Sequence, residues 1–101
     1  MALVSGLEAA RAALSMGERV LESPPYAGCH AGVNYYLALL KQLNAEFPDV
    51  EFAFTLSCGD DAAIAHDALR LGIRRVRCDC SEKQWQELRQ MAEKCNAELV
   101  R

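Results

Sequence analysis

The feature that most constrains the fold is a strict alternation of side chains over residues 50–57. Val50, Phe52, Phe54 and Leu56 alternate there with Glu51, Ala53, Thr55 and Ser57. A period of two with aromatic and β-branched residues is typical of a β-strand. Apolar stripes with helical spacing precede it over residues 33–47 and follow it over residues 60–71, where Asp60 or Asp61 is the predicted N-cap. Strands that alternate with helices predict an α/β protein with a parallel sheet.

The N-terminal part of the chain continues this alternation. Ser5 and Glu8 have the spacing of a capping box, which predicts a helix that begins at Ser5 and ends at Gly17. Residues 19–22 are predicted to form a short strand, because the prolines that follow cannot donate to a sheet ladder. Residues 24–32 are predicted to form a loop of small residues.

The C-terminal part repeats the pattern once more. Residues 73–78 predict a strand, and their three arginines favour a position at the edge of the sheet. Ser81 and Gln84 form a second capping box, which opens a helix whose predicted inner face includes Cys95. Residues 97–100 are compatible with a further short strand.

The predicted order of elements is αβαβαβα, with residues 97–100 as a candidate terminal strand. Because right-handed crossovers join parallel strands, we expect a single domain over residues 1–101. It has three layers, in which three or four parallel strands lie between flanking helices. One core of this size is marginally stable alone, and so small a sheet leaves apolar surface uncovered. We therefore expect a homodimer, held by edge-to-edge or helix-face contacts.

Composition excludes several classes of protein. Of the 101 residues 51% are hydrophobic, and 14 acidic residues against 11 basic ones give a net charge of −3. A disordered chain would need lower hydrophobicity and a higher net charge, and a nucleic-acid-binding protein would need clustered basic residues. No stretch approaches the roughly 20 apolar residues of a membrane span. We therefore expect neither nucleic acid nor a membrane as its partner. The first residues lack the basic region of a signal peptide, so we expect a cytoplasmic protein.

Part of the chain resembles the receiver domains of response regulators. The segment LKQLNAEFPDV at residues 40–50 is similar to the helix and proline that lead into their fourth strand, and residues 60–72 are similar to the helix that follows. The resemblance implies a flavodoxin-like fold. Asp79 stands where that family has its lysine, and Glu22 is the acid nearest to the position of the phosphate-accepting aspartate. Residues 58–77 also resemble the βα units of TIM-barrel enzymes, in which Ala-Leu-x-x-Gly precedes a strand.

Chemically versatile residues gather where the predicted strands end. Cys29 and His30 follow the first strand, Cys58 and Asp60 follow the second, and Cys78 and Cys80 follow the third. Ligands bind at the carboxyl ends of the strands in open parallel sheets. Thiolates and imidazoles are the ligands that zinc prefers in tetrahedral sites. These six residues are therefore the predicted ligand-binding residues, with zinc as the candidate metal.

The cysteines also have two other interpretations. Cys58 precedes a helix N-terminus, whose N–H groups and dipole lower the pKa of a thiol, so it is the candidate nucleophile of a thiol-dependent enzyme. Free cysteine equally packs as a small hydrophobic residue, and no base for Cys58 is recognisable. We therefore expect a non-enzymatic interaction or regulatory module that acts as a homo-oligomer or with a protein partner. A metal- or small-ligand-binding protein and a thiol-dependent enzyme remain the alternatives.

Overall fold

Five parallel strands form the sheet of the computed structural model, which describes residues 1–101. In chain order the elements are β1 (Ala2–Leu3), α1 (Leu7–Ser15), β2 (Val20–Glu22), α2 (Ala27–His30), α3 (Val33–Glu46), β3 (Ala53–Ser57), α4 (Ala62–Arg70), β4 (Arg75–Arg77), α5 (Glu82–Lys94) and β5 (Glu98–Val100). The predicted α/β class with a parallel sheet is confirmed, and the candidate terminal strand is β5. None of the five helices has the length and apolar character needed to cross a membrane.

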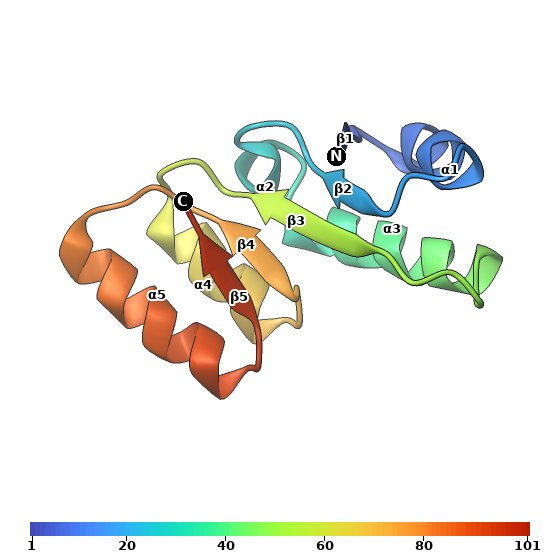
Figure 1. Ribbon diagram of the computed structural model, residues 1–101. Helices are drawn as coiled ribbons and strands as arrows, with labels where there is room; N and C mark the ends of the chain where they lie inside the picture. Colours follow the sequence, from blue (N-terminus) through green and yellow to red (C-terminus); the bar gives the residue numbers. More distant parts are fainter.

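The strands lie in the sheet in the same order as in the chain, β1-β2-β3-β4-β5. Because parallel crossovers are right-handed, adding every strand to the same edge places every helix on the same face. The helices accordingly contact one another in succession, α1 with α3, α3 with α4 and α4 with α5 (Figure 1). They form one layer over the sheet. A flavodoxin-like sheet reverses its strand order, whereas the order here is that of the βα units of barrels.

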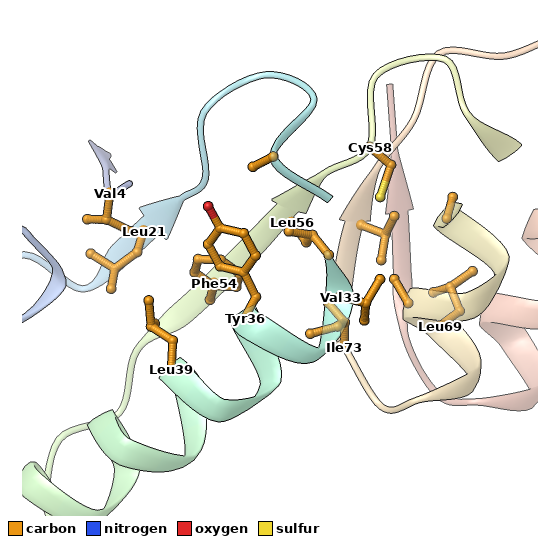
Figure 2. Packing of buried hydrophobic residues seen from close by; sticks show 14 of the residues in the cluster. Val4, Leu21, Val33, Tyr36, Leu39, Phe54, Leu56, Cys58, Leu69 and Ile73 are labelled. Carbon is orange, nitrogen blue, oxygen red and sulfur yellow. The ribbon is translucent and has the colours of Figure 1, made fainter. Parts of the chain in front are cut away.

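One face of the sheet packs against this helical layer. The register places Leu21 beside Phe54 and Leu56 beside Val76, and all four side chains are buried. The ring of Tyr36 from α3 stacks on that of Phe54, with 5.7 Å between the ring centroids (Figure 2). Removal of this apolar surface from water is the main force that holds helices and sheet together.

The opposite face of the sheet carries no helix, and we call it the open face. It consists of the side chains that alternate with the core residues along the strands: Leu3, Val20, Glu22, Ala53, Thr55, Ser57, Arg75, Arg77, Glu98 and Val100. Leu3 and Val20 leave 61% and 47% of their surface exposed. Parallel sheets are normally covered on both faces, so this exposure is unusual.

Three predictions for the N-terminal part are corrected. Ser5 does not cap α1, because Gly6 is the N-cap and no side chain bonds to the helix end. Residues 2–3 pair with β2 as a strand that the sequence did not predict, since two residues are too few to show a period. The predicted loop over residues 24–32 contains one helical turn, α2.

The prediction that β4 is an edge strand is wrong. β5 pairs with β4 on the side away from β3, so β4 lies inside the sheet. Its arginines are accommodated there because Arg75 and Arg77 lie on the open face rather than in the core. Cys95 does not belong to the inner face of α5: the helix ends at Lys94, and Cys95 is its exposed C-cap.

Other predicted helix boundaries are confirmed. Asp61 accepts a hydrogen bond of 3.1 Å from the backbone N–H of Ile64 at the start of α4. Ser81 accepts one of 3.3 Å from the backbone N–H of Gln84 at the start of α5. Gly72 follows α4 with a φ of 104°, a left-handed conformation that glycine adopts without the steric penalty of a side chain.

An ion pair joins α1 to α3. The Nε and Nη2 atoms of Arg11 each donate a hydrogen bond of 2.6 Å to the carboxylate of Glu46. Gln42 donates a third hydrogen bond to the same carboxylate. The hydrogen bonds from Arg11, and then that from Gln42, lower the pKa of Glu46 from 4.5 to about 2. Two helices that are distant in sequence are therefore held together by one ionised carboxylate.

Glu46→Gln is expected to weaken the acid dependence of stability. Because folding lowers the pKa of Glu46, its contribution is fully present above about pH 4.5 and is lost as the pH falls towards 2. The free energy of unfolding of the wild type should therefore fall more steeply between pH 4.5 and pH 2 than that of the variant. Urea titrations at several pH values measure this difference. Glu93→Gln, at an exposed site without an ion pair, should keep the wild-type slope, and equal slopes in all three proteins would contradict the assignment.

Candidate functional site

The carboxyl ends of β2, β3 and β4 meet at one edge of the sheet. A cavity of about 370 Å³ opens there, and we call it the carboxyl-edge cavity; its lining residues are Tyr26, Ser57, Gly59, Asp60, Arg77, Asp79 and Arg101. In barrels built from βα units this is the end of the strands at which ligands bind. Of the six predicted ligand-binding residues, only Asp60 lines the cavity.

Tyr26 and Gly59 build one wall of the cavity together. Tyr26 has a φ of 61°, a left-handed conformation that is rare for a tyrosine. Its ring lies directly against Gly59, where an added Cβ would stand 2.2 Å from the ring. Gly59 also has a φ of 62°, so both the space and the backbone favour glycine there. A strained residue of this kind persists only where its surroundings hold it in place.

His30 contacts the ring of Tyr26 rather than the cysteines, and it does not line the cavity. Its ring stacks on that of Tyr26, with 6.3 Å between the ring centroids and 23° between the planes. His30 is exposed, whereas the thiol of the adjacent Cys29 donates a hydrogen bond to the carbonyl oxygen of Cys58, at 3.5 Å. The side chains of the histidine and the cysteine therefore contact different neighbours.

An ion pair across β3 supports the cavity from the open face. The Nε and Nη2 atoms of Arg77 donate to the two carboxylate oxygens of Glu22, at 2.9 and 3.0 Å. The Nη1 atom of Arg77 donates to the backbone carbonyl of Arg101. Two carboxylate oxygens on one guanidinium make a charge-assisted, geometrically specific contact. It links β2 to β4 above the buried side chains of Thr55 and Ser57.

Arg101 also lines the cavity. The guanidinium of Arg101 donates to Glu82 at 2.9 Å and lies over the ring of Trp85, 4.3 Å from its centroid. Arg101 is thereby directed along the start of α5. The cavity combines two guanidinium groups with the carboxylates of Asp60 and Asp79. It therefore offers both hydrogen-bond donors and hydrogen-bond acceptors to a polar ligand.

The buried cysteines lie beneath the cavity and not in it. Cys58 and Cys78 continue the core face of β3 and β4, and both are fully buried. Figure 2 shows Cys58 at the end of β3. Burial, and then the charges of Cys29 and Asp61, raise the pKa of Cys58 to about 12. Burial, and then the neighbouring Cys80, raise the pKa of Cys78 to about 12 as well. At neutral pH both residues are protonated thiols that pack as part of the core.

This geometry does not favour the metal or nucleophile interpretation. No group of three or more His, Cys, Asp or Glu side chains is placed to hold a metal ion, so the zinc donor set expected from the six residues is not assembled. The helix N-terminus that follows Cys58 was expected to lower the pKa of its thiol, but burial raises that pKa instead. Cys29, which is half-buried, also has its pKa raised by burial and by Asp61 and Asp60.

Six of the seven cavity residues are not among the predicted ligand-binding residues: Tyr26, Ser57, Gly59, Arg77, Asp79 and Arg101. Arg77 carried a usable signal, because it alternates with the core residue Val76 and must therefore face the other side of its strand. Ser57 carried the same signal on β3. Tyr26 and Arg101 reach the cavity through a loop conformation and a chain end, for which no periodic pattern exists.

Comparison with known proteins adds no family to this description. No protein-family model matches the chain, and neither a curated protein nor a solved structure matches it. The fold and the site thus define a parallel α/β protein with one open sheet face and a polar cavity at the carboxyl edge.

Proposed function

We propose that the protein is a small, non-enzymatic interaction module of the cytoplasm that acts as a homo-oligomer, with a second copy of the chain covering the open face. The exposure of that face carries the proposal. Parallel sheets normally bury both faces, and here Leu3 and Val20 remain in contact with water. Covering such side chains is favourable by about 25 cal/mol for each Å² of apolar surface.

The charges of the open face support a second copy as the partner. The face carries two glutamates, Glu22 and Glu98, and two arginines, Arg75 and Arg77. A strongly acidic or strongly basic partner would meet like charges at half of these positions. Glu22 already pairs with Arg77 and Glu98 with Arg75 in the same protomer, so a second copy related by a two-fold axis presents an equally balanced face without like-charge repulsion.

The free thiols support the cytoplasmic part of the proposal. All five cysteines are unpaired. Free thiols persist in the reducing cytosol, whereas oxidising compartments convert accessible thiols to disulfides. The exposed Cys95 and the half-buried Cys29 and Cys80 are the residues to which this argument applies.

Val20→Arg is expected to weaken self-association by at least about tenfold, because an unpaired charge would have to enter the interface. Val20 makes no core contact, since its side chain lies on the open face, so the fold should be retained. Analytical ultracentrifugation over a range of protein concentrations measures the dissociation constant. The wild type is expected to sediment as a dimer at micromolar concentration.

Met16→Arg is the matched control. It introduces the same charge at another exposed apolar residue, at the C-terminal end of α1 and away from the sheet. It should leave the dimer unchanged. A monomeric wild type, or equal dissociation of the two variants, would overturn the proposal.

A further inference from the structure

A second cleft lies between α3 and the start of β4. β3 pairs with β2 over residues 53–55, but it pairs with β4 only over residues 56–57. The N-terminal half of β3 therefore has no strand on its β4 side. A cavity of about 380 Å³ occupies this place, and we call it the α3–β4 cleft.

Apolar side chains form the walls of the α3–β4 cleft. Leu37 and Leu40 come from α3. Phe52 directly precedes β3, and Phe54 lies near its start. Phe54 is buried, but the other three are half-buried and present apolar surface to the cleft. The volume of the cleft lies in the range of small-molecule sites, about 300–1,000 Å³.

Two unpaired cations lie beside these apolar walls. Lys41 of α3 and Arg74, which directly precedes β4, both line the cleft, together with the amide of Asn44. Neither cation takes part in any ion pair of the molecule. No carboxylate lines the cleft, in contrast to the carboxyl-edge cavity. In a chain of net charge −3, the cleft is a local concentration of positive charge.

We propose that the α3–β4 cleft binds a small amphipathic acid. Its hydrocarbon part packs between the leucines of α3 and the two phenylalanines, and its carboxylate lies between Lys41 and Arg74. A guanidinium donates two parallel hydrogen bonds to a carboxylate, and the ammonium adds a second positive charge. An uncharged apolar ligand would leave the cations without a partner, and an inorganic anion would leave the apolar walls in water. The proposal does not rest on the self-association proposed for the open face, although Ala53 belongs to both surfaces.

Titration of the ¹⁵N-labelled protein with sodium octanoate tests the proposal. Saturable chemical-shift changes are expected at the amides of Leu40 and Phe52. Octan-1-ol, which has the same chain without the charge, should bind at least about tenfold more weakly, because it cannot form charge-assisted hydrogen bonds. Inorganic phosphate should give no saturable change at these amides. No saturable change with octanoate, or equal affinity for octanoate and octan-1-ol, would overturn the proposal.

Charge-removing variants test the role of the two cations. Arg74→Gln and Lys41→Gln are each expected to weaken octanoate binding about threefold to tenfold, and both side chains are exposed, so the fold should be retained. Arg70→Gln is the matched control: Arg70 pairs with Asp67 on α4 and does not line the cleft. It should bind octanoate as the wild type does. Unchanged affinity in both cleft variants would overturn the proposed site.

Discussion

Leu56→Ala is expected to lower the free energy of unfolding by about 3–5 kcal/mol. Leu56 is fully buried on the core face of β3, in register with Val76 of β4. Its Cδ2 atom lies 3.5 Å from the point at which a Cβ on Gly28 would stand, so α2 also packs tightly against it. Because these neighbours belong to a strand and a helix that other contacts hold in place, they cannot collapse into the space that the leucine leaves. Urea denaturation followed by circular dichroism measures the loss.

Two further variants keep this prediction testable. Leu71→Ala removes the same atoms at the C-cap of α4, where the side chain is 39% exposed, and should lose less than about 1 kcal/mol. Leu56→Met keeps the volume of the core and should lose less than about 1.5 kcal/mol, so it can be measured even if the alanine variant does not fold. Similar losses for Leu56→Ala and Leu71→Ala would contradict the placement of Leu56 at the centre of the core.

The core face could be predicted from the sequence because its signal is local. The period of two over residues 50–57 identifies β3 and separates the side chains that meet the helices from those that do not. The same parity continues to Cys58, and from Val76 to Cys78, and both thiols lie on the core face. Burial of these thiols therefore follows from the alternation itself. Their position after the strands suggested a ligand site, but the alternation of side chains along each strand places them on the core face, under the helical layer.

The open face and the carboxyl-edge cavity could not be predicted, because they depend on contacts between distant strands. Glu22 and Arg77 are 55 residues apart, and they meet only because β2 and β4 lie on either side of β3. No local pattern determines the strand order. The arginines of β4 suggested an edge strand. The strand that pairs with its outer side, β5, is only three residues long and therefore gives a weak signal in the sequence. The same strand order determines whether the helices cover one face of the sheet or both.

Arg77→Ala is expected to lower the free energy of unfolding by about 1–3 kcal/mol. The substitution removes both hydrogen bonds to Glu22 and the one to the carbonyl of Arg101. The side chain of Glu22 is only 14% exposed, so its carboxylate would remain partly desolvated without its partner. Arg77 itself is 37% exposed, which keeps the loss below that of a fully buried pair. Urea denaturation at neutral pH measures it.

Arg75→Ala on the same strand is the matched control for Arg77→Ala. Arg75 pairs with Glu98 at 3.0 Å, but Glu98 is largely exposed, so the loss should be less than about 1 kcal/mol. A double-mutant cycle with Arg77→Ala and Glu22→Gln should give a coupling energy of about 1–2 kcal/mol, because either change breaks the same contact. Salt should reduce this coupling only slightly, since partly buried pairs are poorly screened. Equal losses at the two arginines, or no coupling, would mean that the bridge across β3 does not hold β2 and β4 together. The guanidinium of Arg77 would then be free to bind a ligand in the carboxyl-edge cavity.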